Sequence, residues 1–531
     1  MQWNPPVELT AREVKLCGRL QKQRRFYRFL RLHRHRLFDA AFQAELAQMY
    51  SATPRGTPPV PPARLAMIVL LQAYARTSDF DAVQNTEMDA RWQLVLDCLD
   101  ADKALIGEST LVDFRTRLVT SGLYEALLRR TVDLAKETRD FGYKQVAGLR
   151  IALDSSPLEG AGRVEDTINL LGHALRILVH AIAALVVLTP SEVIAGARLT
   201  VVAAASTKAG LDQAWGGDDA TQQALQTLHE EVQRLTAWVA TQRLGGLSTH
   251  AVEAARAQLA HLTAQNVAPD AQGRLALIDG VAPDRQISLS DPEMRHGRKS
   301  ATKKINGYKQ YVALDIDTSL TLAAGVLPAN VPEAQGADKL RPALDTHGPV
   351  QQLLIDCAFT SSQLAADVAA RPDGDVVCRA VRVQNQGLYT KQDFTIDVAA
   401  RTVRCPAGNL VVIQGDTVHF ADATCATCPQ RAACQKPAAQ HGRTITIAPD
   451  EVALQARIAR QKTPEGRAQL RQRTAVEHTL AHHCGRQGPR ARYRGVRMND
   501  FDACRTAAVG NLLVIDRRVR DATEAPQRLA A

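Results

Sequence analysis

The 531-residue sequence contains no run of 18 or more apolar residues. Its longest apolar candidate, LRILVHAIAALVVLTP, includes Arg176 and His180 and is too short to cross a bilayer. The N-terminal segment has no apolar core followed by a small-residue cleavage site, so we expect neither a secretory leader nor a membrane partner. Ten cysteines without such a leader predict reduced thiols or metal ligation rather than a disulfide framework.

Basic residues outnumber acidic ones. The sequence has 65 Lys and Arg against 55 Asp and Glu, which gives a formal net charge of +10 and a pI near 9.2. This excess favours a polyanionic partner, and nucleic acid is preferred to a membrane because no lipid-facing segment accompanies the charge. The length is sufficient for roughly two to four domains.

Two short apolar segments end in aspartate: GLRIALD ends at Asp154, and QQLLID ends at Asp356. Aliphatic runs flanked by turn-forming residues are typical of strands buried on both faces of a sheet. A carboxylate at the end of such a strand must be neutralised by a proton, a cation or a metal ion. The two aspartates therefore indicate a divalent-metal site, and the alternative is that each only caps the turn that follows its strand.

The N-terminal segment 12–36 contains ten Lys or Arg residues and one acid, Glu13, interleaved with large apolar residues. The spacing predicts an amphipathic helix whose cationic face contacts either phosphate or solvent. A Pro-rich linker, TPRGTPPVPPA, follows and marks a boundary.

Residues 63–138 have helical patterns, with capping-box spacing at Thr110 and Asp113 and a small-residue turn at Ser121 and Gly122. A helix-turn-helix DNA reader and a plain helical bundle are both compatible with this pattern. In the first case the outward cations would be Arg115, Arg117, Arg129 and Arg130.

From Asp154 onward the patterns follow the order strand, long insertion, hairpin, helix, strand, helix, strand, which predicts a mixed α/β sheet. Glu165 and Asp166, in the loop before a long helix, are rival metal ligands. The stretch from about 210 to 270 predicts an inserted antiparallel helix pair. Residues 293–309 hold six Lys or Arg residues and one acid, and run into the predicted hairpin.

A cysteine cluster occupies a segment of short β-prone pieces between 385 and 450. Cys405, Cys425, Cys428 and Cys434 are separated by 19, two and five residues. The CATC piece has the ligand spacing of structural zinc sites, and a lobe with few large apolar residues would gain stability from a metal. The alternative is four ordinary thiols.

The segment 467–497 holds eight arginines and a single acid, Glu477, within a helical pattern in which Arg473 lies four residues earlier. Carboxylates that hold metal ions together with guanidiniums that contact phosphate are what a metal-dependent phosphodiester enzyme requires. The alternative is an Arg-to-Glu pair on a solvated basic helix face.

Several blocks resemble bacterial insertion-sequence transposases of the DDE class. The blocks that carry the resemblance are IALDSSPLEGAG, DPEMRHGRKSATKKINGYKQYVALD, LLIDCAF, CPAG with C-x-x-C-P, and RTAVEHTLAHHCGRQGPRARYRG. The resemblance implies a helical DNA-binding N-terminal domain (1–145) and a ribonuclease H-like mixed-sheet catalytic domain (146–531). The catalytic domain would carry a helical insertion at about 200–285 and the cysteine lobe at about 385–450.

By the same resemblance Asp154, Asp356 and Glu477 match the catalytic triad and would hold two Mg²⁺ or Mn²⁺ ions, with a structural Zn²⁺ in the cysteine lobe. The implied activity is cleavage at the element's ends and transfer of the 3′ ends to target DNA. The expected DNA-binding residues are Arg295, Arg298, Lys299, Lys303, Lys304, Lys309, Arg473, Arg490, Arg492 and Arg494. The implied partners are double-stranded DNA (terminal inverted repeats and target) and further copies of the chain, in a bacterial, nucleoid-associated cytoplasmic setting.

The sequence also departs from this family. Relatives often carry a Tyr three residues before the Arg473 position and a Lys seven after the Glu477 position, where this chain has Leu470 and Cys484. The Trp that steadies a flipped base in some relatives has no counterpart here, so no DNA hairpin intermediate is inferred. Two alternative functions remain: a metal-dependent nuclease of the same fold without strand transfer, and an inactive DNA-binding descendant of a transposase.

Overall fold

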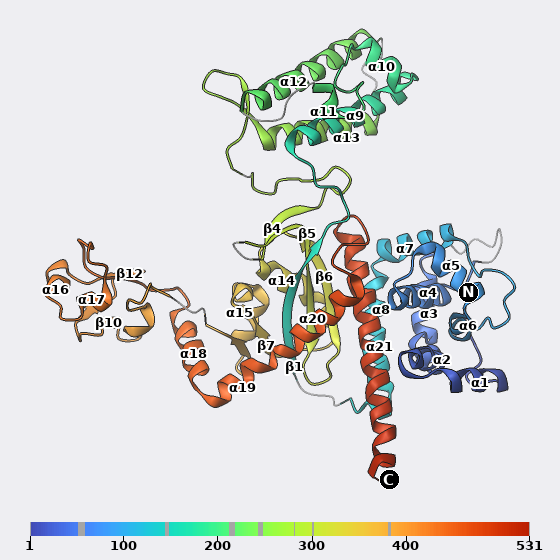
Figure 1. The fold of residues 1–531 in the computed structure, drawn as a ribbon. Helices are drawn as coiled ribbons and strands as arrows, with labels where there is room; N and C mark the ends of the chain where they lie inside the picture. Colours follow the sequence, from blue (N-terminus) through green and yellow to red (C-terminus); the bar gives the residue numbers. More distant parts are fainter. Residues whose placement is uncertain are drawn as a thin grey trace.

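The computed structural model of the chain describes residues 2–50, 59–143, 148–211, 218–242, 248–280, 282–299, 302–380 and 384–529 (Figure 1). A central sheet lies between a helical N-terminal region on one side and a small lobe of short strands and helices on the other. A separate helical body stands above the sheet in this view. The chain is therefore a mixed α/β protein with a helical N-terminal region, as predicted.

The N-terminal region consists of short helices. They are α1 (Ala11–Arg19), α2 (Arg25–Leu37), α3 (Ala40–Ala47), α4 (Pro62–Ala75), α5 (Asp79–Met88), α6 (Ala90–Leu96), α7 (Glu108–Ser121) and α8 (Leu123–Glu137). A capping box starts α1, because the Thr10 hydroxyl accepts the N–H of Glu13 and the Glu13 carboxylate accepts the N–H of Thr10. Most of the predicted Pro-rich linker lies outside the described residues.

Two local predictions for this region are wrong. The basic segment 12–36 forms two helices instead of one, because the backbone becomes extended at Leu20 (φ −80°, ψ 92°). The capping box predicted at Thr110 does not form, since α7 already begins at Glu108, with Gly107 as its N-cap and no side-chain cap bond. The predicted turn is present: Gly122 joins α7 to α8 with φ 77°, a left-handed conformation that favours glycine.

Several arginines of the N-terminal region are turned inward. The Arg31 side chain is 1% exposed and donates to both Glu13 carboxylate oxygens, from Nε at 2.6 Å and from a terminal nitrogen at 3.0 Å. Arg34 is equally buried and donates to the Leu94 and Val95 carbonyls and to Asp97. Some cations of the predicted outer face are therefore buried and paired inside the helical region.

The arginines proposed for a helix-turn-helix reader are also divided. Arg115 is buried and forms a two-pronged pair with Asp79, with both N···O distances at 2.5 Å. Arg130 is largely buried and pairs with Asp39 at 2.8 Å. Arg117 is exposed over the Tyr50 ring, and Arg129 is 42% exposed. Two of the four therefore stabilise the helical region itself.

The central sheet has six strands: β1 (Leu149–Glu159), β4 (Arg295–Arg298), β5 (Lys304–Asp315), β6 (Thr321–Pro328), β7 (Val350–Ile355) and β8 (Asp375–Cys378). The order along the sheet is β4-β5-β1-β7-β8, and β6 pairs with β5. Strands β1, β7 and β8 are mutually parallel, whereas β5 runs antiparallel to β1, β4 and β6. The predicted order of elements and the hairpin at β5 and β6 are confirmed.

Asp154 does not end its strand, contrary to the prediction. β1 continues to Glu159 because its second half stays paired with β5, from Asp154 opposite Val312 to Glu159 opposite Gly307. At that end the two strands approach closely: a Cβ on Gly307 would lie 2.3 Å from the backbone nitrogen of Gly160. Asp154 therefore lies in the middle of a long central strand, and Asp356 directly follows β7 as predicted.

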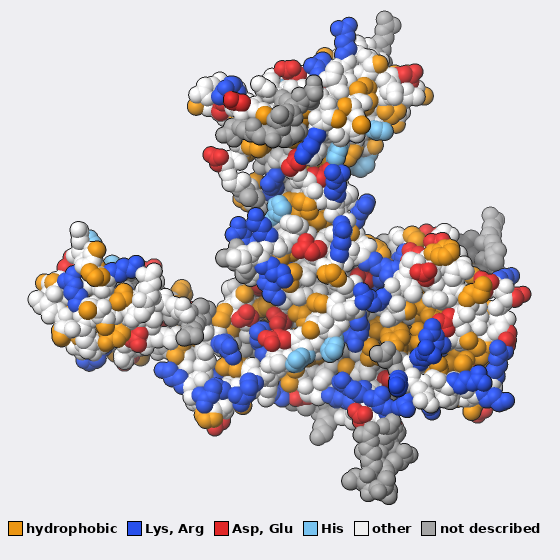
Figure 2. Space-filling view, viewed as in Figure 1, with side chains coloured by type: hydrophobic (Ala, Val, Ile, Leu, Met, Phe, Trp, Pro, Cys, Tyr) orange, Lys and Arg blue, Asp and Glu red, His pale blue; other side chains and the backbone are white. Residues whose placement is uncertain are grey.

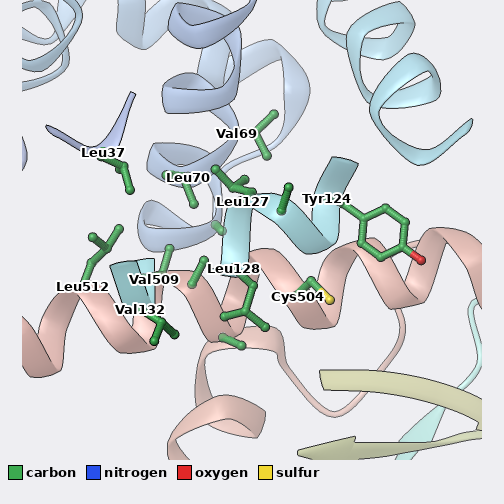
Figure 3. Close-up of a cluster of buried hydrophobic side chains, with 14 of the residues drawn as sticks. Leu37, Val69, Leu70, Tyr124, Leu127, Leu128, Val132, Cys504, Val509 and Leu512 are labelled. Atoms are coloured by element: carbon green, nitrogen blue, oxygen red, sulfur yellow. The ribbon is translucent and has the colours of Figure 1, made fainter. Parts of the chain in front are cut away.

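Helices cover both faces of the sheet. One face packs on α14 (Glu333–Asp345), α15 (Gln363–Ala369) and α21 (Val496–Leu529), and the other packs on α20 (Thr474–Gln487). Figure 3 shows Leu70 and Leu127 of the N-terminal region beside Val509 and Leu512 of α21. The N-terminal region and the C-terminal helix thus share one apolar core with the sheet.

The helical body contains α9 (Thr167–Val186), α10 (Pro190–Gly196), α11 (Thr207–Leu211), α12 (Asp218–Thr241), α13 (His250–Asn266) and the hairpin β2 (Val267–Pro269) and β3 (Leu275–Leu277). Its core is its own, and the predicted helix pair corresponds to α12 and α13. By length and composition α9 could cross a membrane, yet 56% of its apolar window is buried inside the protein. The core helix of a soluble domain has the same properties.

The small lobe consists of β9 (Thr395–Asp397), β10 (Thr402–Arg404), β11 (Leu410–Val412), β12 (Thr417–His419), α16 (Asp422–Ala426), α17 (Arg431–Cys434) and β13 (Thr444–Thr446). Phe394, Val403 and Phe420 belong to its compact core. Two helices, α18 (Glu451–Lys462) and α19 (Pro464–Gln472), lead from the lobe back to α20 at the sheet.

Candidate active site

The three predicted carboxylates come to one face of the sheet because of strand periodicity. Ala152 and Leu354 belong to the core beneath α20, and side chains two residues apart on a strand share a face. The parallel register of β1 and β7 pairs Ala152 with Leu354, so Asp154 and Asp356 each follow two residues later on neighbouring chain segments. Glu477 lies in the first turn of α20, the helix that packs on this face.

The three side chains line one cleft of about 510 Å³. Strand β1 contributes Asp154 and α20 contributes Glu477. Asp356 comes from the position between β7 and the short 3-10 helix Cys357–Phe359. The Asp154 carboxylate accepts the N–H of Ser155, and the Asp356 carboxylate accepts the N–H of Cys357, both at 2.8 Å. More than 300 residues of sequence separate the first acid from the last, and the cleft brings them together.

Arg473 bridges two of these acids. One terminal nitrogen lies 3.4 Å from Asp154, and the other donates to Glu477 at 2.6 Å. Arg473 is the residue that precedes α20, and the four-residue spacing to Glu477 places both side chains on one side of the helix. A single cation therefore occupies the space between a strand carboxylate and a helix carboxylate.

Burial is the main influence on Asp154. It raises the pKa of that carboxyl above the ordinary 3.8, and the nearby Glu477 and Asp356 carboxylates raise it further. The Ser155 N–H and the Arg473 guanidinium act in the opposite direction. The folded protein thus gathers negative charge at a desolvated position, which is the electrostatic condition for binding a cation.

The three carboxylates of the cleft have the chemistry to bind a divalent cation. Carboxylate oxygens are the ligands that Mg²⁺ and Mn²⁺ prefer, and the Arg473 guanidinium already stands in for a positive charge between two of them. Among the described residues, however, no three His, Cys, Asp or Glu side chains lie in metal-binding geometry as they stand. Ion binding would therefore require Arg473 to withdraw and the three carboxylates to close in.

Sequence reasoning missed a fourth acid in the cleft. Glu333, the first residue of α14, lines it and pairs with Lys309 at 3.1 Å. Lys309 also donates to the Val331 carbonyl and is only 8% exposed. The sequence offers one signal, a glutamate directly after Pro332 at a helix start, and that pattern is common in ordinary helices.

Cys484 occupies the place where relatives carry a lysine. Its Sγ lies 3.0 Å from the Ser156 hydroxyl and 3.0 Å from Nε2 of Gln310, and it lines the cleft. These contacts join α20 to β1 and β5 about two helical turns beyond Glu477. The position is therefore part of the cleft's wall.

The ten expected DNA-binding residues fall into three groups by their surroundings. Arg298, Lys299, Lys303, Lys304, Arg490 and Arg494 are exposed; Arg295, Lys309 and Arg492 are engaged with protein groups; Arg473 bridges the acids. Arg298 and Lys299 also line the cleft. Arg490, although exposed, donates to the Gly160 and Ala161 carbonyls.

The rival ligands Glu165 and Asp166 do not line the cleft. The Asp166 carboxylate caps α9 by accepting the N–H of Asn169 at 2.9 Å. Glu165 contacts Nδ1 of His173 at 2.5 Å. Both acids are therefore accounted for by local structure at the start of α9.

The four lobe cysteines line a second, much smaller cavity of about 20 Å³. Burial raises the pKa of the Cys434 thiol, and the proximity of Cys425, Cys428 and Cys405 adds to that rise. The Arg443 N–H donates to the Cys425 sulfur. Cys425 lies in α16 and Cys434 in α17, while Cys405 follows β10 and Cys428 lies between the two helices. The thiols share this cavity, but in the described part of the chain they, like the carboxylates, do not stand in metal-binding geometry.

Comparison with known families identifies the class of protein. Residues 413–515 match the family described as Transposase DDE domain, and residues 17–117 match the Transposase domain family (DUF772). No curated protein and no solved structure matches the chain. The two family matches confirm the resemblance to insertion-sequence transposases of the DDE class. The DDE match includes Glu477 and Arg473, whereas Asp154 and Asp356 lie outside it.

Proposed function

We propose that the chain cleaves DNA at the ends of an insertion sequence and transfers the freed 3′ ends to target DNA. The observation that supports this activity is the cleft in which Asp154, Asp356 and Glu477 meet, with Arg298 and Lys299 at its wall. Carboxylates at the centre and cations beside them suit a phosphodiester substrate.

The three carboxylates would hold divalent ions, Mg²⁺ or Mn²⁺, which when bound activate the attacking oxygen and stabilise the leaving oxygen. Asp154 and Asp356 would fix the strand side of the site, and Glu477 would approach from α20. Arg473, released from Asp154 and Glu477, would then contact a DNA phosphate.

The chemistry needs no covalent protein intermediate. Water attacks the phosphodiester at the element's end, the bond to the 3′ oxygen breaks, and a 3′-hydroxyl is left. That hydroxyl then attacks a target phosphodiester, so that one new bond to the target strand forms as one target bond breaks. Both steps take place at the same carboxylates.

We also propose a division of the chain into a DNA-reading N-terminal domain (1–145) and a ribonuclease H-like catalytic domain (146–531). The parallel strands β1, β7 and β8 and the antiparallel β5 and β6 support that comparison. The helical body and the cysteine lobe would be insertions into the catalytic domain. Joining two element ends calls for at least two copies of the chain, acting in the bacterial cytoplasm on nucleoid DNA.

In the cysteine lobe we propose a structural zinc ion held by Cys405, Cys425, Cys428 and Cys434. The shared cavity and the thiol donors support it. The thiols would close around the ion on deprotonation, which couples the lobe's fold to metal content. A fixed lobe would in turn steady α18, α19 and α20, and hence Glu477.

A strand-transfer assay with a pre-cleaved element end separates this function from its alternatives. A transposase joins that end to target DNA when Mg²⁺ is present. A nuclease of the same fold cleaves intact ends but yields no joined product, and an inactive descendant binds DNA and does neither. Absence of joined product with both metals and several end sequences would contradict the proposal.

A further inference from the structure

A basic groove lies next to the cleft. It has a volume of about 660 Å³ and is bounded by the segment after β8, by α18 and by α19. Four cations line it: Arg379, Lys462, Arg467 and Arg471. No acidic residue is among the described side chains of its wall. We name this surface the α18–α19 groove.

The four cations of the α18–α19 groove are exposed and uncompensated. In the described part of the chain, none of them forms an ion pair with a carboxylate, and the Arg467 guanidinium donates only to the Lys462 carbonyl. Two neighbours on α18 behave differently, since Arg457 pairs with Asp450 and Arg460 pairs with Asp375, both at 2.6 Å. The chain therefore neutralises the flanking cations and leaves those of the groove open.

The α18–α19 groove and the cleft adjoin at two places. Arg471 lines the groove, and Arg473, two residues later, lines the cleft. On the strand side, Asp356 lines the cleft, and the next residue, Cys357, donates its thiol to the carbonyl of Arg379 in the groove. A chain of phosphates that leaves the cleft in this direction would therefore enter the groove.

The arrangement is visible on the surface. In Figure 2 acidic side chains lie near the centre of this face, with Lys and Arg side chains gathered above them over β4 and below them over α18 and α19. A polyanion whose reacting phosphate sits at the acids would then be held on both sides of that phosphate. The wall also offers Gln392 and Gln461, which can donate to phosphate oxygens without reading bases.

We infer that the α18–α19 groove binds the DNA backbone on one side of the reacting phosphate, through contacts that do not depend on base sequence. The inference rests on the proposed function, because it assigns to the transposase a second DNA-holding surface beyond the cleft's own rim. The ligand is the sugar-phosphate backbone, which either the element-end duplex or the target duplex supplies.

The test compares the full-length wild type with a Lys462→Ala/Arg467→Ala double variant. Both side chains are exposed, so the fold should be retained. Each lost phosphate contact lowers the slope of log affinity against log salt by about 0.9, so the double variant should lose about 1.8 from the slope. The loss should be the same on random duplex and on terminal-repeat duplex. The control is Arg256→Ala, which removes an exposed arginine from α13 and should leave the slope unchanged.

Two activity assays show whether the groove binds the element-end duplex or the target duplex. If joining of a pre-cleaved end falls while cleavage of an intact end is retained, the groove holds target DNA; if both fall together, it holds the element end. An unchanged salt slope in the double variant, or an equal drop in Arg256→Ala, would overturn the inference. The salt-dependence measurement needs only DNA binding and no cleavage. A wild type that binds DNA but neither cleaves nor joins it would therefore refute the proposed function, while the salt slopes would still decide whether the groove binds DNA.

Discussion

The N-terminal helical region and the face around the cleft are both rich in arginine, yet the structure treats their charges differently. In the N-terminal region Arg31, Arg34 and Arg115 are buried against Glu13, Asp97 and Asp79. Around the cleft, Arg298, Arg467 and Arg471 stay exposed, and Arg473 holds two acids of the candidate site.

The difference shows that a basic composition alone does not locate a nucleic-acid interface. A buried guanidinium that is paired with a carboxylate is not available to phosphate, and removing it would leave that carboxylate buried without a counter-charge. An exposed cation without a partner contributes little to folding and remains available to a ligand. Substitutions on the face around the cleft should therefore change activity and DNA affinity, and substitutions in the buried N-terminal pairs should change stability.

The largest effect is expected at the acids of the cleft. Asp356→Asn should lower the cleavage rate more than about 100-fold, the scale seen when one preorganised charge is removed from an active site, because it removes one of the proposed metal ligands. DNA affinity should stay largely intact, since no phosphate contact is lost. Cleavage of labelled element ends and a binding isotherm measure both. Equal loss of binding and cleavage would show that Asp356 is structural.

The opposite behaviour is expected at the buried pair. Arg31→Ala should lower the free energy of unfolding by about 3–5 kcal/mol, because Glu13 would remain buried without its counter-charge. The exposed Arg24→Ala should change it by less than about 0.5 kcal/mol. Denaturant unfolding measures the two. A loss of DNA affinity in Arg31→Ala without any loss of stability would contradict the contrast between the regions.

Substitutions in the cysteine lobe should act through zinc content. If the proposed zinc site is present, Cys428→Ser should lower the zinc content from about one ion per chain to near zero, because only three of its four proposed thiol ligands remain. Cleavage should decline while the Mg²⁺ concentration needed for half-maximal rate stays the same, since the carboxylates are untouched. Elemental analysis and a Mg²⁺ titration test this. Wild-type protein without zinc would eliminate the proposed site.

The smallest effect concerns pH. Burial raises the pKa of Asp154, so its proton is favoured in the folded state: its contribution to stability is complete below the ordinary pKa of 3.8 and declines as the pH rises through the raised value. Ion binding needs the ionised carboxylate, so cleavage should decline as the pH falls towards that raised pKa.

Substitutions of Arg473 test whether protonation of Asp154 causes the loss of cleavage at low pH. Arg473→Ala removes the positive charge that lowers the Asp154 pKa, so the acid limb of the pH–rate profile should move to higher pH. Arg473→Lys retains a cation and should shift the limb less. Each profile is scaled to its own maximum, since both variants lose phosphate contacts. An acid limb at the same pH in all three proteins would show that another group controls it.

The sequence by itself determined the strands at Asp154 and Asp356, the hairpin at β5 and β6, α14 and the helix of Glu477, because hydrophobic periodicity and turn residues act over a few positions. It also singled out the three acids and four cysteines, which the structure places around two cavities.

Prediction from the sequence failed where partners distant in sequence decide the structure. β1 continues beyond Asp154 because β5 pairs with it, and Arg31 and Arg115 turn inward because Glu13 and Asp79 lie there. The Glu333–Lys309 pair and the α18–α19 groove are products of tertiary packing for the same reason: ion pairing and exposure depend on which surfaces meet, and local residue patterns do not encode that.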